Sequence, residues 1–234
     1  MDYFPNAQDF NAARVTVPGQ SEIIQQSLYD FNLYAGAGQT SLTFFQNPIG
    51  AGLTTALGAT AGTVKTKADT NMQMAAQLPS GIGFLAESIE IYFNPGSVST
   101  ASTFTIDTLT FFLAAASAVP TAQVDDVSAF TQSGSLEFNI LQKNYLREAP
   151  LGRFPPKVHT KLNAAIASNS ATTAEVGVAN AYSEGRPMYV GRIGLQPAMN
   201  FEVKMEWPGL VAMTSGFNAR VGVVLDGYMM RAVQ

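Results

Sequence analysis

The sequence predicts an all-β protein, an antiparallel β-sandwich of the jelly-roll type. Eight or nine segments alternate apolar and polar residues with the period of two that marks half-buried strands. The connections between these segments differ widely in length, and no helical pattern follows each strand, as a parallel α/β sheet would require. The sequence shows no internal repeat of about 20 to 50 residues, which argues against a solenoid or a propeller.

The strand count decides between two forms of this fold. A double jelly roll needs about sixteen strands, and the sequence offers eight or nine. We therefore expect a single jelly roll, with a compact double jelly roll as the alternative.

Residues 1–40 are expected to form an N-terminal arm, ahead of a jelly-roll domain over residues 41–234. Pro5 and Pro18 interrupt this stretch, and its apolar residues follow no regular period. Within it, the segment from Ser21 to Tyr34 fits a helix and an extended strand equally well. We expect the arm to reach across to neighbouring molecules.

Strands are predicted next in the first half of the domain, at residues 41–46, 64–67, 82–93 and 104–113. The clearest is 82–93, where Ile89 and Ile91 share one face and Glu90 lies on the other. The adjacent pair Phe44-Phe45 cannot place both rings on one face of a strand, so the second ring must be covered by another layer, a loop or a neighbouring subunit.

The second half of the domain is predicted to contain four strands and one helix. The strands are expected at residues 136–141, 187–195, 201–207 and 219–230, the last as a strand pair or one strand bent at Asp226-Gly227. A short helix is expected near 159–169, because Leu162, Ala165 and Ile166 have helical spacing. Residues 170–181 are small and polar and are expected to form an exposed loop.

Charged residues are scarce and unevenly distributed. They make up 13% of the 234 residues, about half of the usual ~25%. Residues 1–142 carry a net charge of -8 and residues 143–234 a net charge of +4. This composition excludes a charge-rich disordered chain and a basic protein that coats nucleic acid, and the absence of cysteine excludes a disulfide scaffold.

The densest positive charge lies in a Pro-containing connector, which we call the basic segment. Its basic residues are Lys143, Arg147, Arg153, Lys157 and Lys161. The segment is either a solvated loop or a contact surface for phosphate, a membrane or an acidic neighbour. The charge asymmetry adds a further possibility, in which the acidic half of one copy faces the basic half of another.

Groups suited to catalysis or metal binding are few. Glu87 and Glu90 are predicted to point to opposite faces of one strand, and Asp125-Asp126 is predicted to lie in a turn. His159 is the one histidine and has no acidic residue close in sequence. We therefore expect no enzyme activity, no cofactor, no metal and no small-molecule substrate. No apolar run reaches the ~18 residues of a transmembrane helix.

Four stretches resemble a known family, the jelly-roll major capsid proteins of tailless icosahedral bacteriophages. They are FLAESIEIYF at 84–93, SGSLEFNILQKNYLREAPLGRFP at 133–155, GRIGLQPAMNFEVKMEWPG at 191–209 and ARVGVVLDGYMMRAVQ at 219–234. The resemblance implies a β-sandwich that self-assembles into a closed icosahedral shell around the genome.

From this resemblance we expect a virion protein, made in the host cytoplasm, whose partners are other copies of itself and other capsid proteins. The basic segment would then face packaged genome, an internal membrane or the next subunit. The alternative is a carbohydrate- or receptor-binding jelly-roll module of a phage fibre or spike. For that alternative, Tyr92 and Tyr189 are the first candidates for the ligand-binding aromatic.

Overall fold

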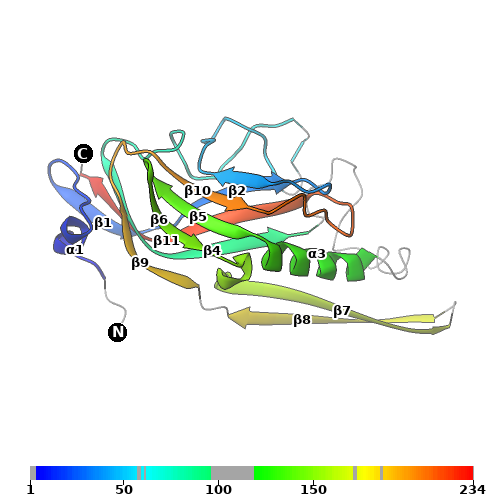
Figure 1. Ribbon diagram of the computed structural model, residues 1–234. Coiled ribbons are helices and arrows are strands. Elements are labelled where there is room, and N and C mark those ends of the chain that lie inside the picture. Colours follow the sequence, from blue (N-terminus) through cyan, green and yellow to red (C-terminus); the bar gives the residue numbers. More distant parts are fainter. Residues whose placement is uncertain are drawn as a thin grey trace.

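The fold is mostly β and is built from two curled antiparallel sheets (Figure 1). The computed structural model describes residues 4–56, 59–60, 62–95, 119–170, 173–184 and 187–233, with backbone alone for 119–124, 158–170 and 173–184. The helices are α1 (Ala7–Ala12), α3 (Val119–Ser133) and the 3-10 helix η1 (Leu151–Arg153). The strands are β1 (Ser21–Gln25), β2 (Leu28–Tyr34), β3 (Ser41–Phe44), β4 (Ile82–Asn94), β5 (Ser135–Ile140), β6 (Lys143–Glu148), β7 (Val158–Ser170), β8 (Thr173–Glu184), β9 (Met188–Leu195), β10 (Phe201–Glu206) and β11 (Ala219–Ala232).

The strand order is that of one jelly roll. The five-stranded sheet runs β1-β11-β4-β9, and β2 also pairs with β11; the four-stranded sheet runs β3-β10-β5-β6. Since β4 occupies one side of β11 along its length, β1 and β2 share the other side and count as one interrupted strand. Numbered along the chain, the eight sandwich strands then lie in the orders 1-8-3-6 and 2-7-4-5, which define a single jelly roll. The predicted fold class is confirmed, and the double form is not seen in the described residues.

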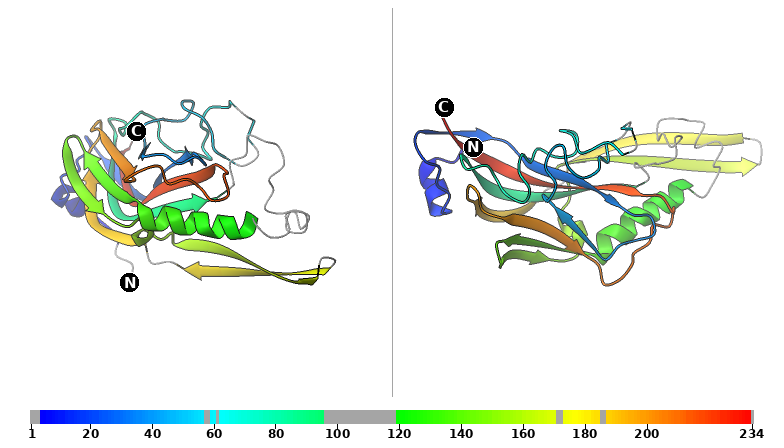
Figure 2. Two further views of the ribbon diagram at one scale, coloured as in Figure 1. Left: turned by 45° about the vertical axis from the view of Figure 1, so that its right-hand side comes forward. Right: turned by 90° about the horizontal axis from the view of Figure 1, so that it is seen from above.

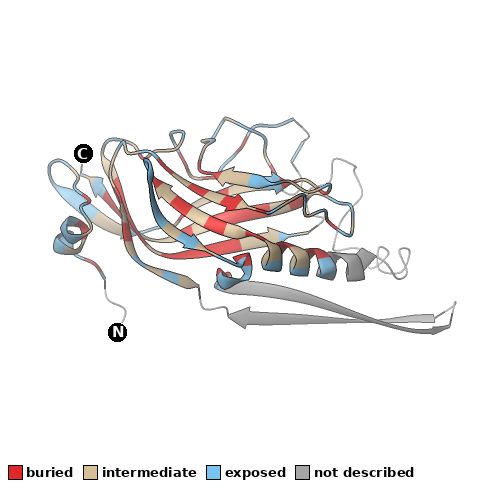
Figure 3. Cartoon of the chain, viewed as in Figure 1, coloured by how far each residue is buried: buried red, intermediate tan, exposed pale blue. Residues whose placement is uncertain are grey.

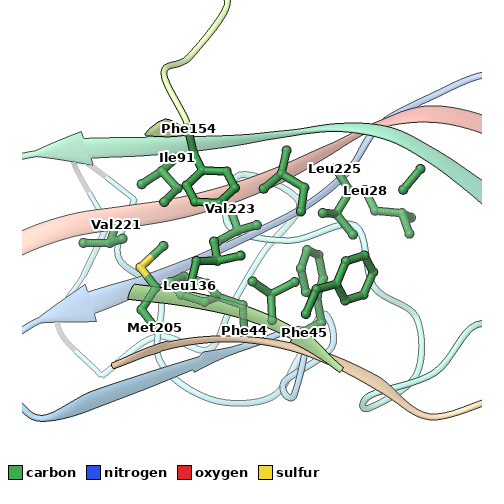
Figure 4. Packing of buried hydrophobic residues seen from close by; sticks show 14 of the residues in the cluster. Leu28, Phe44, Phe45, Ile91, Leu136, Phe154, Met205, Val221, Val223 and Leu225 are labelled. Carbon is green, nitrogen blue, oxygen red and sulfur yellow. The ribbon is translucent and has the colours of Figure 1, made fainter. Parts of the chain in front are cut away.

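The core lies between the two sheets, as the alternating sequence of the strands requires. Buried residues alternate with half-buried ones along β5 and β10 (Figure 3). In Figure 4, Leu136 and Met205 of the smaller sheet face Val221, Val223 and Leu225 of β11. This apolar contact between the sheets supplies the main burial that holds the sandwich together.

The adjacent rings of Phe44 and Phe45 both lie in this core, with no exposed surface. Phe45 has a φ of 68°, which breaks the alternation of the strand just after β3 and turns the second ring inward. Its ring centroid lies 5.4 Å from that of Phe201 on β10. The second ring was expected to be covered by another layer, a loop or a neighbouring subunit. It is covered by other residues of the same chain, in the core between the sheets.

The N-terminal residues expected as an arm supply part of the sandwich. β1 and β2 pair with β11, and Leu28 and Tyr34 are buried in the core. Helix α1 packs on the outer face of the larger sheet, where Phe10 is fully buried against Leu85 and Tyr228. Phe10, Leu28 and Tyr34 of this stretch therefore find their apolar partners within their own chain.

The helix predicted near 159–169 is wrong, because these residues lie in strand β7. β7 pairs with β8 in a two-stranded hairpin that belongs to neither sheet and projects beyond the end of the sandwich (Figures 1 and 2). The loop predicted at 170–181 is wrong for the same reason, since β8 covers most of it. The spacing of Leu162 and Ile166 fits a helix and a strand equally well. These residues form a strand because they pair with β8.

The remaining strand predictions divide into three groups. Those at 41–46, 82–93, 136–141, 187–195, 201–207 and 219–230 correspond to β3, β4, β5, β9, β10 and β11. The last is one strand, and its register shifts at Asp226/Gly227 where the bend was expected. The strand predicted at 64–67 is absent, and Lys65 within it is buried. The strand predicted at 104–113 lies outside the described residues.

Candidate functional site

The basic segment is not a single loop. Lys143 and Arg147 lie on β6, the edge strand of the smaller sheet, and Arg153 ends η1. Lys157 directly precedes β7, and Lys161 lies within β7, where the backbone alone is described. The five predicted contact residues are therefore spread over an edge strand, a short helix and the base of the hairpin.

Three of these basic side chains form ion pairs with acidic residues of the same chain. Nε of Arg147 lies 2.6 Å from Oε1 of Glu137 on the neighbouring strand, and Arg153 pairs with Glu148. Lys157 pairs with Asp226 and lies 3.9 Å from Glu90. The sequence did not reveal Glu90 and Asp226 as partners of Lys157, since both are distant along the chain. The pairing lowers the net positive charge of the segment.

Exposed apolar side chains gather in the connections between strands. Leu53 (66% exposed), Ile49 and Val64 lie on the long loop between β3 and β4. Leu210 (69% exposed) and Phe217 lie in the loop between β10 and β11. Apolar surface exposed in this way on otherwise well-packed loops is typical of contact regions.

A buried ion pair fixes the long β3–β4 loop to strand β2. Nζ of Lys65 lies 2.6 Å from Oδ1 of Asp30, and both side chains are 1% exposed. The same ammonium donates to Oδ1 of Asn32 at 2.7 Å, while Oδ2 of Asp30 accepts the backbone N–H of Phe45. The loop therefore has a defined position on the sheet.

Asp69 is a second anchor of the same loop. It accepts hydrogen bonds from the side chains or backbone of Thr54, Thr55 and Thr66. Nη2 of Arg220 on β11 lies 3.6 Å from its Oδ1. Burial alone would raise the pKa of Asp69, but these hydrogen bonds and the charge of Arg220 outweigh burial and hold the pKa below its ordinary value.

These anchors place the loop beside a hollow on the outer face of the larger sheet. The hollow has a volume of about 480 Å³. Its lining residues come from the strands below, the connection between β1 and β2, and the long loop: Gln26, Ser27, Tyr29, Phe31, Lys67, Ala68, Asn71, Tyr92 and Val224. It contains Tyr92, one of the two aromatic candidates, whereas Tyr189 lies outside its lining.

The floor of the hollow is aromatic because of the strand register. Phe31 on β2 and Tyr92 on β4 both lie opposite Gly222 on β11, and the two ring centroids are 6.4 Å apart. A Cβ at position 222 would lie 2.1 Å from Cε1 of Phe31, so glycine is required for the ring to lie over the strand. The guanidinium of Arg220 lies 4.0 Å from the centroid of Phe31.

The tyrosine hydroxyls at the hollow are held by hydrogen bonds. Tyr92 donates to Oε2 of Glu90 at 3.0 Å, and Tyr29 donates to the carbonyl oxygen of Lys67 at 2.6 Å. Burial, followed by the nearby charge of Glu90, raises the pKa of Tyr92 to about 12. Both hydroxyls therefore stay protonated near neutral pH and can still accept a hydrogen bond from a ligand.

The candidate catalytic residues are not brought together. Asp126 is buried on α3, where its carboxylate accepts hydrogen bonds from Ser215; it is not in the predicted turn. Nε of Arg192 lies 3.6 Å from Glu87, whereas Glu90 faces Tyr92 and Lys157, so the two glutamates have separate partners. The side chain of His159 is outside the described residues.

The part of the chain that the structure describes holds no group of three or more His, Cys, Asp or Glu side chains that could bind a metal ion. It also holds no helix with the length and apolar character needed to cross a membrane.

Comparison with known proteins gives no match: no family model, no curated protein and no solved structure is similar to this chain.

Proposed function

We propose that this protein is the major capsid subunit of a tailless icosahedral bacteriophage, a component of the virion whose work is self-association. The observation that carries the proposal is a single jelly roll whose connections, rather than its strand faces, hold most of the large exposed apolar side chains. A shell subunit needs a rigid body with contact surfaces around its rim, and strand connections provide them.

The loop between β3 and β4 is the best-defined of these contact surfaces. Leu53 and Val64 are exposed on it, although Lys65 and Asp69 hold the loop to the sheet from within. A loop that is fixed before contact loses little conformational entropy when it docks on a neighbour. The low overall charge agrees with surface that becomes buried between copies.

The basic segment has three possible partners in such a shell: packaged genome, an internal membrane or the next subunit. Among the described side chains of the segment, Arg147, Arg153 and Lys157 are paired within the chain, which leaves Lys143 as the one cation without an ion pair. Binding to a polyanion requires many free cations. Contact with the next subunit, which needs no row of free cations, is therefore the favoured role of the segment. The proposal requires no cofactor, no metal and no small-molecule substrate.

Assembly of the purified protein tests the proposal. Light scattering and negative-stain electron microscopy over a range of concentration and salt should show closed particles or defined oligomers. The variant Leu53→Asp should assemble less well, while Val233→Asp, at a similarly exposed residue beyond β11, serves as the matched control. A monodisperse 24.9 kDa monomer under every condition would contradict the proposal.

A further inference from the structure

The hollow over β2, β11 and β4 is a feature that self-association does not explain. Its volume of about 480 Å³ lies within the range of about 300 to 1,000 Å³ for small-ligand sites. It is shallow and widely open to solvent, so a ligand can reach its floor without movement of the sheet. Its floor is specified by Gly222, which leaves space for the Phe31 ring beside Tyr92.

The floor is suited to an apolar ring face. Phe31, Tyr92 and Val224 contribute it from three adjacent strands, and Tyr29 adds a third ring whose centroid lies 6.4 Å from that of Phe31. Aromatic rings of this kind bind flat ligands and the C–H faces of pyranose rings by dispersion and burial. Shape alone therefore allows an aromatic compound, a nucleobase or a sugar.

The rim offers hydrogen-bonding groups that suit a ligand carrying hydroxyl groups. The side chains of Gln26 and Lys67 are exposed there and make no hydrogen bond to any described residue. The hydroxyls of Tyr29 and Tyr92 each donate their proton to an oxygen of the same chain, and each oxygen can still accept a hydrogen bond from a ligand. The site thus offers donors and acceptors around an apolar floor, which hydroxyl groups can satisfy in both directions.

The charges around the hollow argue against a polyanion. Arg220 faces Asp69, and Lys157 lies between Glu90 and Asp226. Lys67 is the one lining residue with a positive charge and has no ion pair among the described residues. A nucleic-acid strand needs a continuous row of free cations, so the local charge balance favours a neutral ligand.

We propose that this hollow is a binding site for a neutral saccharide, with a pyranose ring stacked on Phe31 and Tyr92 and its hydroxyls bonded to Gln26 and Lys67. The site is independent of the proposed shell role, because the lining comes from one chain. A capsid subunit with this site would bind sugars on a cell surface or on another virion protein. The same site would serve the alternative role of a fibre or spike module.

Saturation-transfer NMR on the purified protein tests this inference. The probes are the methyl pyranosides of glucose, galactose, mannose and N-acetylglucosamine, with phenol and a thymidine oligonucleotide as competing ligand classes. We expect transfer to the ring C–H protons of at least one pyranoside. Tyr92→Ala should weaken its affinity roughly tenfold or more, since one stacking surface is lost.

Matched variants separate loss of the site from loss of the fold. Tyr189→Ala removes an exposed tyrosine on β9 outside the hollow and should bind like the wild type. Lys67→Ala changes an exposed rim residue and should weaken binding without altering the thermal midpoint. No transfer from any pyranoside, unchanged affinity in both Tyr92→Ala and Lys67→Ala, or preferred binding of phenol or the oligonucleotide would overturn the inference. None of these outcomes bears on whether the protein assembles.

Discussion

Lys65 and Asp30 form an ion pair of 2.6 Å in which both side chains are almost completely buried. They join residues far apart in the sequence, one on the β3–β4 loop and the other on β2. Asn32 and the backbone N–H of Phe45 complete the hydrogen bonding around the pair. The desolvation cost of such a pair offsets much of its attraction, but the pair is costly to break, because one buried charge is left without a partner.

Replacement of Asp30 by alanine should therefore lower the free energy of unfolding by about 3–5 kcal/mol. Urea denaturation followed by circular dichroism measures the change. The control is Glu22→Ala, which removes a partner from the exposed pair with Arg231 and should cost less than about 1 kcal/mol. Equal effects of the two substitutions would show that Lys65 is not buried as described.

The depressed pKa of Asp69 predicts a loss of stability in acid. Because the folded state holds this carboxyl below its ordinary pKa of 3.8, the stabilisation is present above that value and is lost as pH falls through the folded pKa. Unfolding experiments from neutral pH down to about pH 3 should show the decline. Asp69→Asn should be less stable at neutral pH and show a shallower decline in acid. A wild-type curve parallel to that of the variant would contradict the assignment.

Gly227 is predicted to tolerate no side chain. It lies at the register shift between β11 and β4, where a Cβ would come 1.9 Å from the carbonyl oxygen of Leu85. Backbone must move to admit it, so Gly227→Ala should destabilise the protein by about 1–3 kcal/mol or more. Gly209→Ala is the control, because no atom lies within 4 Å of its added Cβ. Thermal unfolding of both variants distinguishes them, and a normal midpoint for Gly227→Ala would refute the close approach.

The basic segment is predicted to contribute electrostatically to assembly. Substitution of Arg147, Arg153 and Lys157 by glutamine should weaken assembly more at low salt than at high salt, because salt already screens these charges. Light scattering at several salt concentrations measures the difference. The control variant, Lys204→Gln, changes a basic residue outside the segment. An identical salt dependence for both proteins would remove the segment from the interface.

Strands with a clean alternation could be predicted from the sequence, and their partners could not. β10 and β4 were recognised because apolar residues, such as Val203 in β10 and Ile91 in β4, stand at every second position with polar residues beside them. β6 was missed because its charged residues resemble a loop, which is usual for an edge strand. Helix α3 was missed because Val119–Ser133 is rich in small and polar residues and lacks a strong apolar stripe.

The hollow was beyond prediction for a geometric reason. Phe31, Gly222 and Tyr92 lie on three strands that become neighbours only through the register of β11. Tyr92 was named as a candidate from its place on the polar face of β4, but nothing in the sequence linked it to Phe31. One local signal was available, since Gly222 interrupts a run of valines where a buried strand would favour another β-branched residue.

The central position of β11 has a consequence for biosynthesis. β1, β2 and β4 all pair with β11, so the larger sheet has no centre until residues 219–232 leave the ribosome. Until then, β1, β2 and β4 of the nascent chain lack this partner, and the contacts that complete β1 and β2 span most of the sequence. The larger sheet can therefore complete its pairing only after β11 has been synthesised, however early β1 and β2 emerge.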